Sequence, residues 1–246
     1  MDERSLPRFF VEGAHDVGDV VALQGADARK VRLVLRRATG DAVELFDSTG
    51  SAFVGSLRVD ARGVDVRIER RASAAREPAL QMTLAQAIPK GAKMDFVIEK
   101  ATEAGAARIV PLVTERTIGD PGPAKVDRWR RLARSAAQQS GRATIPAIDA
   151  PIGLAAFLSA EAGRSRLIVP WELAERVALR ERLPALLAGA KDVAIVIGPE
   201  GGLSHAEVDA ARAAGATVVS LGERILRTET AGLVLLSALL YAAGDL

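Results

Sequence analysis

Two segments near the C-terminal end combine glycines with charged residues in a pattern that suits a small-molecule pocket. The first is Ile197–Gly202, with the sequence IGPEGG, and the second is Leu221–Ala231, with the sequence LGERILRTETA. Each follows an apolar, strand-like run and leads into a helix, where open α/β sheets leave backbone N–H and C=O groups free for a ligand. We therefore expect the two segments to be walls of one pocket.

The residues of the first segment narrow the kind of ligand that it suits. The chain has neither the GxxxxGK[ST] pattern of a phosphate-binding loop nor a GxGxxG segment that opens a helix. Pro199 lacks a backbone N–H, and the carboxylate of Glu200 would repel a phosphate group. Gly198, Gly201 and Gly202 have no Cβ, so backbone can approach a flat, neutral or cationic ligand. An adenosine that carries a sulfonium group fits this description.

The composition of the whole chain excludes several kinds of chemistry. The chain has 246 residues, 49% hydrophobic and 26% charged, so we expect a globular protein of one large or two modest domains. It contains no cysteine, and His15 and His205 are its only histidines. Disulfides, a thiol nucleophile and a metal site are therefore not expected.

No segment of the sequence is expected to enter a membrane. The first residues are charged and show no apolar core of a secretory signal. The longest apolar stretch, Ala231–Ala243, is interrupted by glycine and serine and is too short to span a bilayer. We therefore expect a soluble, cytoplasmic protein.

Basic residues gather in two places that we expect to be helical. The first cluster consists of Arg29, Lys30, Arg32, Arg36 and Arg37, and the second of Arg128, Arg130, Arg131, Arg134 and Arg142. Forked guanidinium groups suit phosphate oxygens, so the two clusters together could grip a folded polynucleotide. Two solvated helix faces explain the same charges equally well.

The first 72 residues have the pattern of a small β-barrel with one helix. Short apolar runs predict strands at Arg8–Val11, Val20–Leu23, Ala42–Phe46, Ser51–Gly55 and Val64–Ile68. In the last of these runs apolar and charged residues alternate, which is the period of a half-buried strand. We expect a helix around Ala26–Arg37, and the polar stretch Arg70–Pro78 is the candidate linker to residues 73–246.

Beyond the linker, strands alternate with helices as in a parallel sheet that is covered on both faces. Apolar runs predict strands at Leu80–Ile88, Ala107–Val113, Arg166–Val169, Val193–Ile197 and Thr217–Leu221. Ser204 and Glu207 form a capping box that begins a helix directly after the glycine-rich loop. The last helix, about Thr228–Ala243, is apolar nearly all round, so we expect it to be buried inside its own domain or against another subunit.

Several motifs taken together resemble one enzyme family. Besides the two glycine-containing segments, they are Lys90–Asp95 (KGAKMD), Glu99–Gly105 (EKATEAG), Gln139–Arg142 (QSGR) and Gly244–Leu246 (GDL). On these segments the chain closely resembles, over its whole length, the RsmE family of 16S ribosomal RNA (uracil-N3) methyltransferases in the SPOUT superfamily. The paired IGPEGG and LGxRILRxETA segments are highly specific.

The resemblance implies an α/β fold with two domains. Residues 1–72 would form a PUA-like small β-barrel that holds RNA, and residues 73–246 a trefoil-knotted SPOUT domain that binds S-adenosylmethionine and forms a homodimer. The implied activity is methylation of N3 of a specific uridine in the decoding region of 16S rRNA, on the assembled 30S subunit. The alternatives are a SPOUT methyltransferase that acts on another RNA, such as transfer RNA, and a non-catalytic RNA-binding factor in ribosome assembly.

The resemblance also implies roles for particular residues. The cofactor pocket would be built from the loop after Val169–Pro170, from Ile197–Gly202 and from Leu221–Thr230. Within these segments the residues expected to bind the cofactor are Pro170, Ile197, Gly198, Glu200, Gly202, Leu221, Gly222, Ile225, Leu226 and Thr230. The RNA would be contacted by Arg29, Lys30, Arg36, Lys90, Lys93 and Arg142. The candidate catalytic residues are Arg142, Arg227 and Glu229.

The absence of cysteine bears on the mechanism. Methylation of a pyrimidine at C5 needs a covalent thiol adduct, whereas a ring nitrogen attacks the methyl group directly once it has lost its proton. We therefore expect direct in-line transfer to a flipped-out uridine. Arg142 is expected to contact a phosphate or a uracil oxygen. Glu229 either accepts the N3 proton or stabilises the start of the last helix, and Arg227 either pairs with Glu200 or contacts the RNA.

Two positions depart from the pattern of the family. Gln138 stands where a glutamate is common before QSGR, so we do not expect an essential acid there. Lys30 stands where a histidine is common in the first domain. Because lysine keeps a donor for phosphate, we expect this second change to leave RNA binding intact.

Overall fold

The computed structural model divides into two compact units, which are described separately. It describes residues 6–73, 77–119, 121–174 and 179–246, so residues 74–76 of the predicted linker lie outside the described part. The first unit comprises Met1–Glu77 and Ala137–Thr144, and the second comprises Pro78–Ala136 and Ile145–Leu246. The first unit therefore contains a segment that the sequence, with its single boundary after residue 72, assigns to the second domain.

Five strands build the first unit around an apolar core. They are β1 (Arg8–Val11), β2 (Val20–Leu23), β3 (Ala42–Asp47), β4 (Ala52–Val59) and β5 (Val64–Ala72). They pair in the order β1-β3-β4-β5-β2, in which β1 and β3 are parallel and the other pairs antiparallel. Val64, Val66 and Ile68 are buried while Arg67 and Glu69 are exposed, which confirms the predicted alternation. Closure of this sheet into a barrel stays a prediction.

The helix of the first unit ends earlier than its sequence predicts. An α-helix, α1, spans Gly25–Arg29 and continues into a π-helical turn, η2, over Lys30–Val34. At the end of this turn an amide donates to the carbonyl five residues earlier, which is the π-helical pattern. Arg36 then has a φ of +49°, in the left-handed region. The helix predicted over residues 26–37 is therefore broken by the π turn and this left-handed residue.

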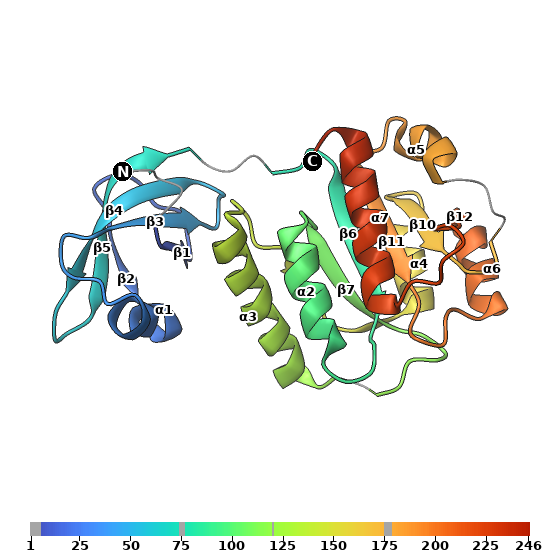
Figure 1. The fold of residues 1–246 in the computed structure, drawn as a ribbon, viewed down its shortest axis with the longest axis horizontal. Helices are drawn as coiled ribbons and strands as arrows, with labels where there is room; N and C mark the ends of the chain where they lie inside the picture. The colour runs from blue at the N-terminus through green and yellow to red at the C-terminus, as the bar shows by residue number, and fades with distance from the viewer. Residues whose placement is uncertain (1–5, 74–76, 120, 175–178) are drawn as a thin grey trace. The chain divides into compact units, whose positions relative to one another are not determined.

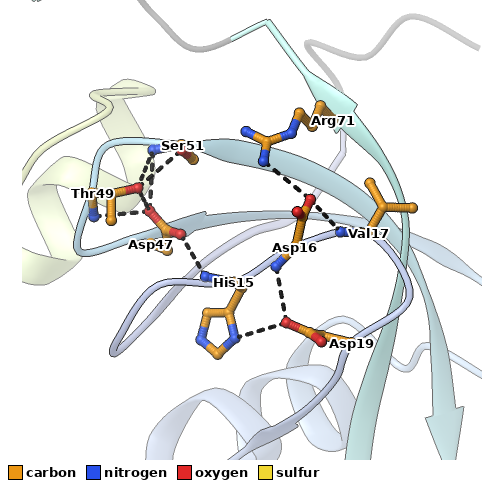
Figure 2. Close-up of polar contacts among 8 residues, drawn as sticks. All are labelled: His15, Asp16, Val17, Asp19, Asp47, Thr49, Ser51 and Arg71. Carbon is orange, nitrogen blue, oxygen red and sulfur yellow. Dashed lines mark hydrogen bonds and ion pairs between the residues drawn. The ribbon is translucent and has the colours of Figure 1, made fainter.

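A buried carboxylate organises the turn between β3 and β4 (Figure 2). Asp47 is 2% exposed, and its Oδ1 accepts hydrogen bonds from the Thr49 amide (2.9 Å), the Thr49 hydroxyl (2.6 Å) and the Ser51 amide (3.1 Å). Its Oδ2 accepts a hydrogen bond from the amide of His15 at 3.1 Å. Burial alone would raise the pKa of this carboxyl, but the hydrogen bonds outweigh burial and hold the pKa below its ordinary value.

We expect Asp47→Ala to lower the free energy of unfolding by about 1–3 kcal/mol at neutral pH, because several donors lose their buried acceptor. The folded-state pKa is lower than the unfolded one, so the carboxylate's contribution is complete above the unfolded pKa of about 4 and is lost as the pH falls through the folded pKa. Urea unfolding should therefore show a larger difference from wild type at neutral pH than at about pH 3. Asp16→Ala, which removes an exposed carboxylate, is the control, and an equal loss in both variants would contradict this role.

Seven strands build the sheet of the second unit. They are β6 (Gln81–Ala87), β7 (Arg108–Val113), β8 (Ala147–Ile148), β9 (Ile152–Gly153), β10 (Arg166–Pro170), β11 (Asp192–Ile197) and β12 (Thr217–Val219). Their order is β12-β10-β11-β6-β7-β8, with β9 also paired to β7, and every pair is parallel. The predicted parallel α/β sheet is thus confirmed.

Helices cover both faces of this sheet. They are α2 (Lys93–Glu103), α3 (Pro123–Ser140), α4 (Leu154–Glu161), α5 (Leu179–Leu187), α6 (His205–Ala213) and α7 (Thr228–Ala243). Within β11, Ile195 packs in the cluster that contains residues of α2 and α7, whereas Val196 packs in the cluster of α4 and α6. Figure 1 shows α2 and α7 side by side on one face, and they contact each other. The alternation along β11 therefore fills two separate apolar layers.

The last helix has the predicted bounds, and it is buried on one side. Leu235, Leu236 and Leu239 are fully buried against the sheet cluster. Val234 and Tyr241 are 43% and 76% exposed, so part of the apolar surface of this helix is uncovered in the single chain.

No helix in the described part of the chain has the length and apolarity that a transmembrane span requires.

Candidate functional site

A cavity of about 700 Å³ lies where three neighbouring strands of the second unit end. It is lined by Pro170–Leu173 after β10, Ile197–Leu203 after β11 and Ser220–Glu229 after β12, together with Lys93 and Ala231. Because β10 lies between β12 and β11 and all three are parallel, their carboxyl ends meet at one edge of the sheet. The two glycine-containing segments thus form walls of one cavity, as their sequence pattern predicts.

Nine of the ten residues that the sequence assigns to the cofactor line the cavity. The exception is Thr230, which lies in α7 and is not part of the lining. The lining also includes Arg227 and Glu229 of the candidate catalytic residues. Trp171, Glu172 and Leu173 line the cavity as well, and they form the loop after Val169–Pro170 that the family resemblance assigns to the cofactor pocket. Their position directly after a buried strand is where open α/β sheets bind ligands.

Two glycines shape the loop after β11. A Cβ on Gly198 would come within 3.0 Å of both the side chain and the amide of Leu203. Gly202 has a φ of +68°, which favours glycine, and its amide donates to the carbonyl of Pro199 at 2.9 Å. The loop therefore folds back on itself closely and leaves its backbone facing the cavity.

A buried polar network ties this loop to the start of α7. The Thr228 hydroxyl donates to the carbonyl of Gly198 at 2.6 Å and accepts a hydrogen bond from Nε2 of Gln86 at 2.8 Å. Gln86 is fully buried in the central strand β6. Sequence reasoning missed both side chains. The available signal is that Gln86 stands between two alanines of a predicted buried strand, because buried amides are nearly always hydrogen-bonded.

Charged side chains form another part of the wall. Nζ of Lys93 lies 2.9 Å from Oε1 of Glu200 and 3.6 Å from Oε2 of Glu229. The hydrogen bond with Glu200 raises the pKa of Lys93. Burial would raise the pKa of Glu200, but hydrogen bonds, first among them that of Lys93, hold it below its ordinary value. Glu200 therefore pairs with Lys93, whereas Arg227 is exposed and has no ion-pair partner within the described ranges.

Arg142, the other candidate catalytic residue, belongs to the first unit. Its side chain is 8% exposed, and its Nη2 and Nε donate to Oε2 of Glu77 at 2.6 and 3.0 Å. The guanidinium of Arg8 donates to the Arg142 carbonyl, and the carboxylate of Glu77 accepts the amides of Ala143 and Thr144. Residues far apart in the sequence thus hold the QSGR segment within the first unit.

The remaining residues that are predicted to contact RNA are divided between the two units. Arg29, Lys30 and Arg36 are exposed around η2 in the first unit. Lys90 is exposed in the second unit, and its backbone amide donates to Glu200 at 3.1 Å. Gln138, the departure from the family pattern, is 9% exposed and belongs to the first unit with Arg142.

The histidines take part in local structure. His205 begins α6 and packs edge-on against Trp171, with ring centroids 5.0 Å apart. The predicted capping box of Ser204 and Glu207 is confirmed, since each side chain accepts a hydrogen bond from the backbone amide of the other residue.

Across the described ranges no group of histidine and acidic residues has an arrangement that could hold a metal ion.

Known proteins resemble the chain over most of its length. The model of the RNA methyltransferase domain family matches residues 76–240. Ribosomal RNA small subunit methyltransferase E of a Synechocystis species is 36% identical over 236 residues, which cover 94% of this chain and 76% of the relative. The protein of the same name from Mycobacterium bovis is 34% identical over 242 residues, covering 94% and 89%. The crystal structure of ribosomal RNA small subunit methyltransferase E from Neisseria gonorrhoeae bound to S-adenosyl methionine has a TM-score of 0.87 at 32% identity, covering 96% of this chain and 97% of that one.

Proposed function

Because the chain belongs to the family of ribosomal RNA small subunit methyltransferase E, we propose that it methylates 16S rRNA with S-adenosylmethionine as methyl donor. We further propose that the acceptor is N3 of a specific uridine in the decoding region, on the assembled 30S subunit. The observation that carries the proposal is that both glycine-containing segments line one cavity.

The residues of the cavity suit this methyl donor. Its volume of about 700 Å³ lies within the range of small-molecule sites. Leu221 and Leu226 supply apolar side chains for an adenine, and the loop of Gly198 and Gly202 presents backbone polar groups without intruding side chains. The donor supplies an electrophilic methyl group on a positively charged sulfur. The wall has an excess of carboxylates (Glu172, Glu200, Glu223 and Glu229) over cations (Lys93, Arg224 and Arg227), and this excess matches a positive charge better than it matches phosphates.

The reacting groups fit direct transfer. The chain holds no cysteine for a covalent adduct, so the uracil nitrogen itself attacks the methyl group after losing its proton. Glu229 lines the cavity and is our candidate for the proton acceptor, and the exposed Arg227 is our candidate for contact with the anionic uracil or the RNA. Arg142 is our candidate for a substrate phosphate or uracil oxygen, with its guanidinium oriented by Glu77.

We propose that the first unit holds RNA as a PUA-like barrel and that the second unit is a knotted SPOUT domain. Arg29, Lys30 and Arg36 offer exposed cations for phosphate contacts that fix the orientation of the RNA. If so, Arg29→Ala and Arg36→Ala should each weaken binding to 30S subunits without changing which base is methylated.

We also propose that the protein acts as a homodimer. Phe96 on α2 and Val234 and Tyr241 on α7 are exposed apolar side chains on two helices that contact each other. Analytical ultracentrifugation should give a dimer, and an active monomer would contradict this part of the proposal.

Methylation assays test the proposed acceptor. The protein is incubated with S-adenosylmethionine labelled in its methyl group and with 30S subunits, naked 16S rRNA or transfer RNA in turn. We expect label at N3 of one uridine, with 30S subunits as the best substrate. Label in transfer RNA alone would show that the proposed rRNA acceptor is wrong. If the protein bound RNA but neither bound the donor nor transferred a methyl group, it would be a non-catalytic assembly factor.

The hydroxyl of Thr228 provides a separate prediction for donor binding. Thr228→Val keeps the shape of the side chain but removes the donor to Gly198 and the acceptor for Gln86. We expect the dissociation constant for S-adenosylmethionine, measured by calorimetry, to rise about tenfold, since a buried hydrogen bond contributes about 1–3 kcal/mol. Thr228→Ser keeps the hydroxyl and should bind like wild type. Equal affinities in the serine and valine variants would contradict a role for this bond.

A further inference from the structure

The ammonium of Lys93 lies between two carboxylates on the wall of the cavity. Its Nζ hydrogen-bonds to Glu200 and lies 3.6 Å from Oε2 of Glu229. Lys93 comes from α2, Glu200 from the loop after β11, and Glu229 from the first turn of α7. Two carboxylates therefore share one ammonium, and the group carries a net negative charge.

Lys93 compensates the carboxylate of Glu229 only incompletely. Its side chain is 13% exposed, and its Oε2 is buried without a hydrogen-bond partner in the part of the chain that the structure describes. A buried carboxylate oxygen without a partner is unfavourable, and the ammonium of Lys93 compensates it only by charge at 3.6 Å. A positively charged group bound in the cavity would compensate the negative charge of this carboxylate.

We propose that Glu200 and Glu229 form the counter-ion of the methyl donor's sulfonium and that Lys93 takes this place in the free protein as an exchangeable internal cation. This inference rests on the proposed function. The donor carries a positive charge on sulfur before transfer. When the carbon–sulfur bond breaks, its electron pair stays on sulfur, the uracil nitrogen forms the new bond to carbon, and a neutral thioether remains. The carboxylate pair thus favours the donor over the product, and the return of Lys93 favours release of the product.

A comparison of the affinities for the donor and for S-adenosylhomocysteine measures the contribution of the sulfonium charge, because the two molecules differ only in the methyl group and its charge. Calorimetry gives the ratio of the dissociation constant for S-adenosylhomocysteine to that for the donor. Lys93→Met removes the internal competitor and should raise this ratio at least about fivefold, and Glu229→Gln should lower it at least about fivefold. No methyl transfer is involved, so a role of Glu229 as proton acceptor does not affect the measurement.

Lys100→Met is the matched control. Lys100 lies on the same helix, also between two glutamates, at 2.8 Å from each, but it does not line the cavity. Its side chain is 37% exposed, against 38% for Lys93. This variant should leave the ratio unchanged while it removes the same charge from the same helix.

The possible outcomes separate the inference from the proposed function. An unchanged ratio in both Lys93→Met and Glu229→Gln would overturn the inference alone. An equal loss of affinity for both molecules in Lys93→Met would also overturn it, because Lys93 would then bind the amino-acid part that they share. Failure of the wild-type protein to bind either molecule would overturn the proposed function as well.

Discussion

Gly198→Val is expected to abolish useful binding of S-adenosylmethionine, with a dissociation constant at least about 100-fold above wild type. Even a single Cβ at this position would lie within 3.0 Å of Leu203 and 3.1 Å of the Gly202 carbonyl carbon. The branched side chain of valine needs more room than the closely packed loop has, so the backbone must move. That movement displaces the polar groups of the wall and breaks the hydrogen bond from Thr228 to the Gly198 carbonyl.

Gly153→Val is the control for this prediction. Gly153 lies in β9, outside the cavity, and a Cβ built on it meets no atom within 4 Å. Calorimetry should show donor binding close to wild type for this control and loss of binding for Gly198→Val, with both proteins folded by circular dichroism. Unaltered affinity in Gly198→Val would mean that the donor does not bind against this loop.

Arg142→Lys is expected to lower methylation of 30S subunits about 100-fold, while the dissociation constant for the donor stays within about twofold of wild type. Lysine keeps the charge but lacks the planar fork with which arginine can hold Glu77 and reach a phosphate or carbonyl oxygen. The cavity that we assign to the donor is built from the second unit alone, so its affinity for the donor should be unaffected.

Glu77→Gln separates a substrate contact from a purely structural role of Arg142. Glu77→Gln removes the charge that pairs with Arg142, and Arg142→Lys removes the two guanidinium hydrogen bonds to Glu77, so both variants should lower the melting temperature. Only Arg142→Lys changes the guanidinium itself, and we expect turnover in Glu77→Gln to fall no more than about tenfold. Equal losses of turnover in the two variants would assign Arg142 to holding the QSGR segment in place.

Local sequence patterns predicted much of the second unit. The capping box of Ser204 and Glu207 involves groups three residues apart, and α7 was visible as a mostly apolar stretch that only Gly232 and Ser237 interrupt after Ala231. Parallel strands that are buried on both faces are mostly apolar, which made the sheet visible in the sequence. The pocket could be predicted because each of its segments follows such a strand.

Local sequence patterns could not predict which residues interact when they are far apart in the chain. The pairing of Arg142 with Glu77 spans 65 positions, and that of Lys93 with Glu200 spans 107. Each of these side chains has many possible partners in the sequence, and only the fold selects one. The same holds for the order of the strands and for the segment 137–144 of the first unit. The π turn at Lys30–Val34 has no established sequence signal, so a regular helix was the natural expectation.

A crystal structure of the protein grown with S-adenosylmethionine tests the central claim most directly. We expect the donor in the cavity between the segments Ile197–Gly202 and Leu221–Glu229, with its adenine between the side chains of Leu221 and Leu226. A donor bound at another place on the protein, or a cavity that stays empty at saturating donor, would contradict it.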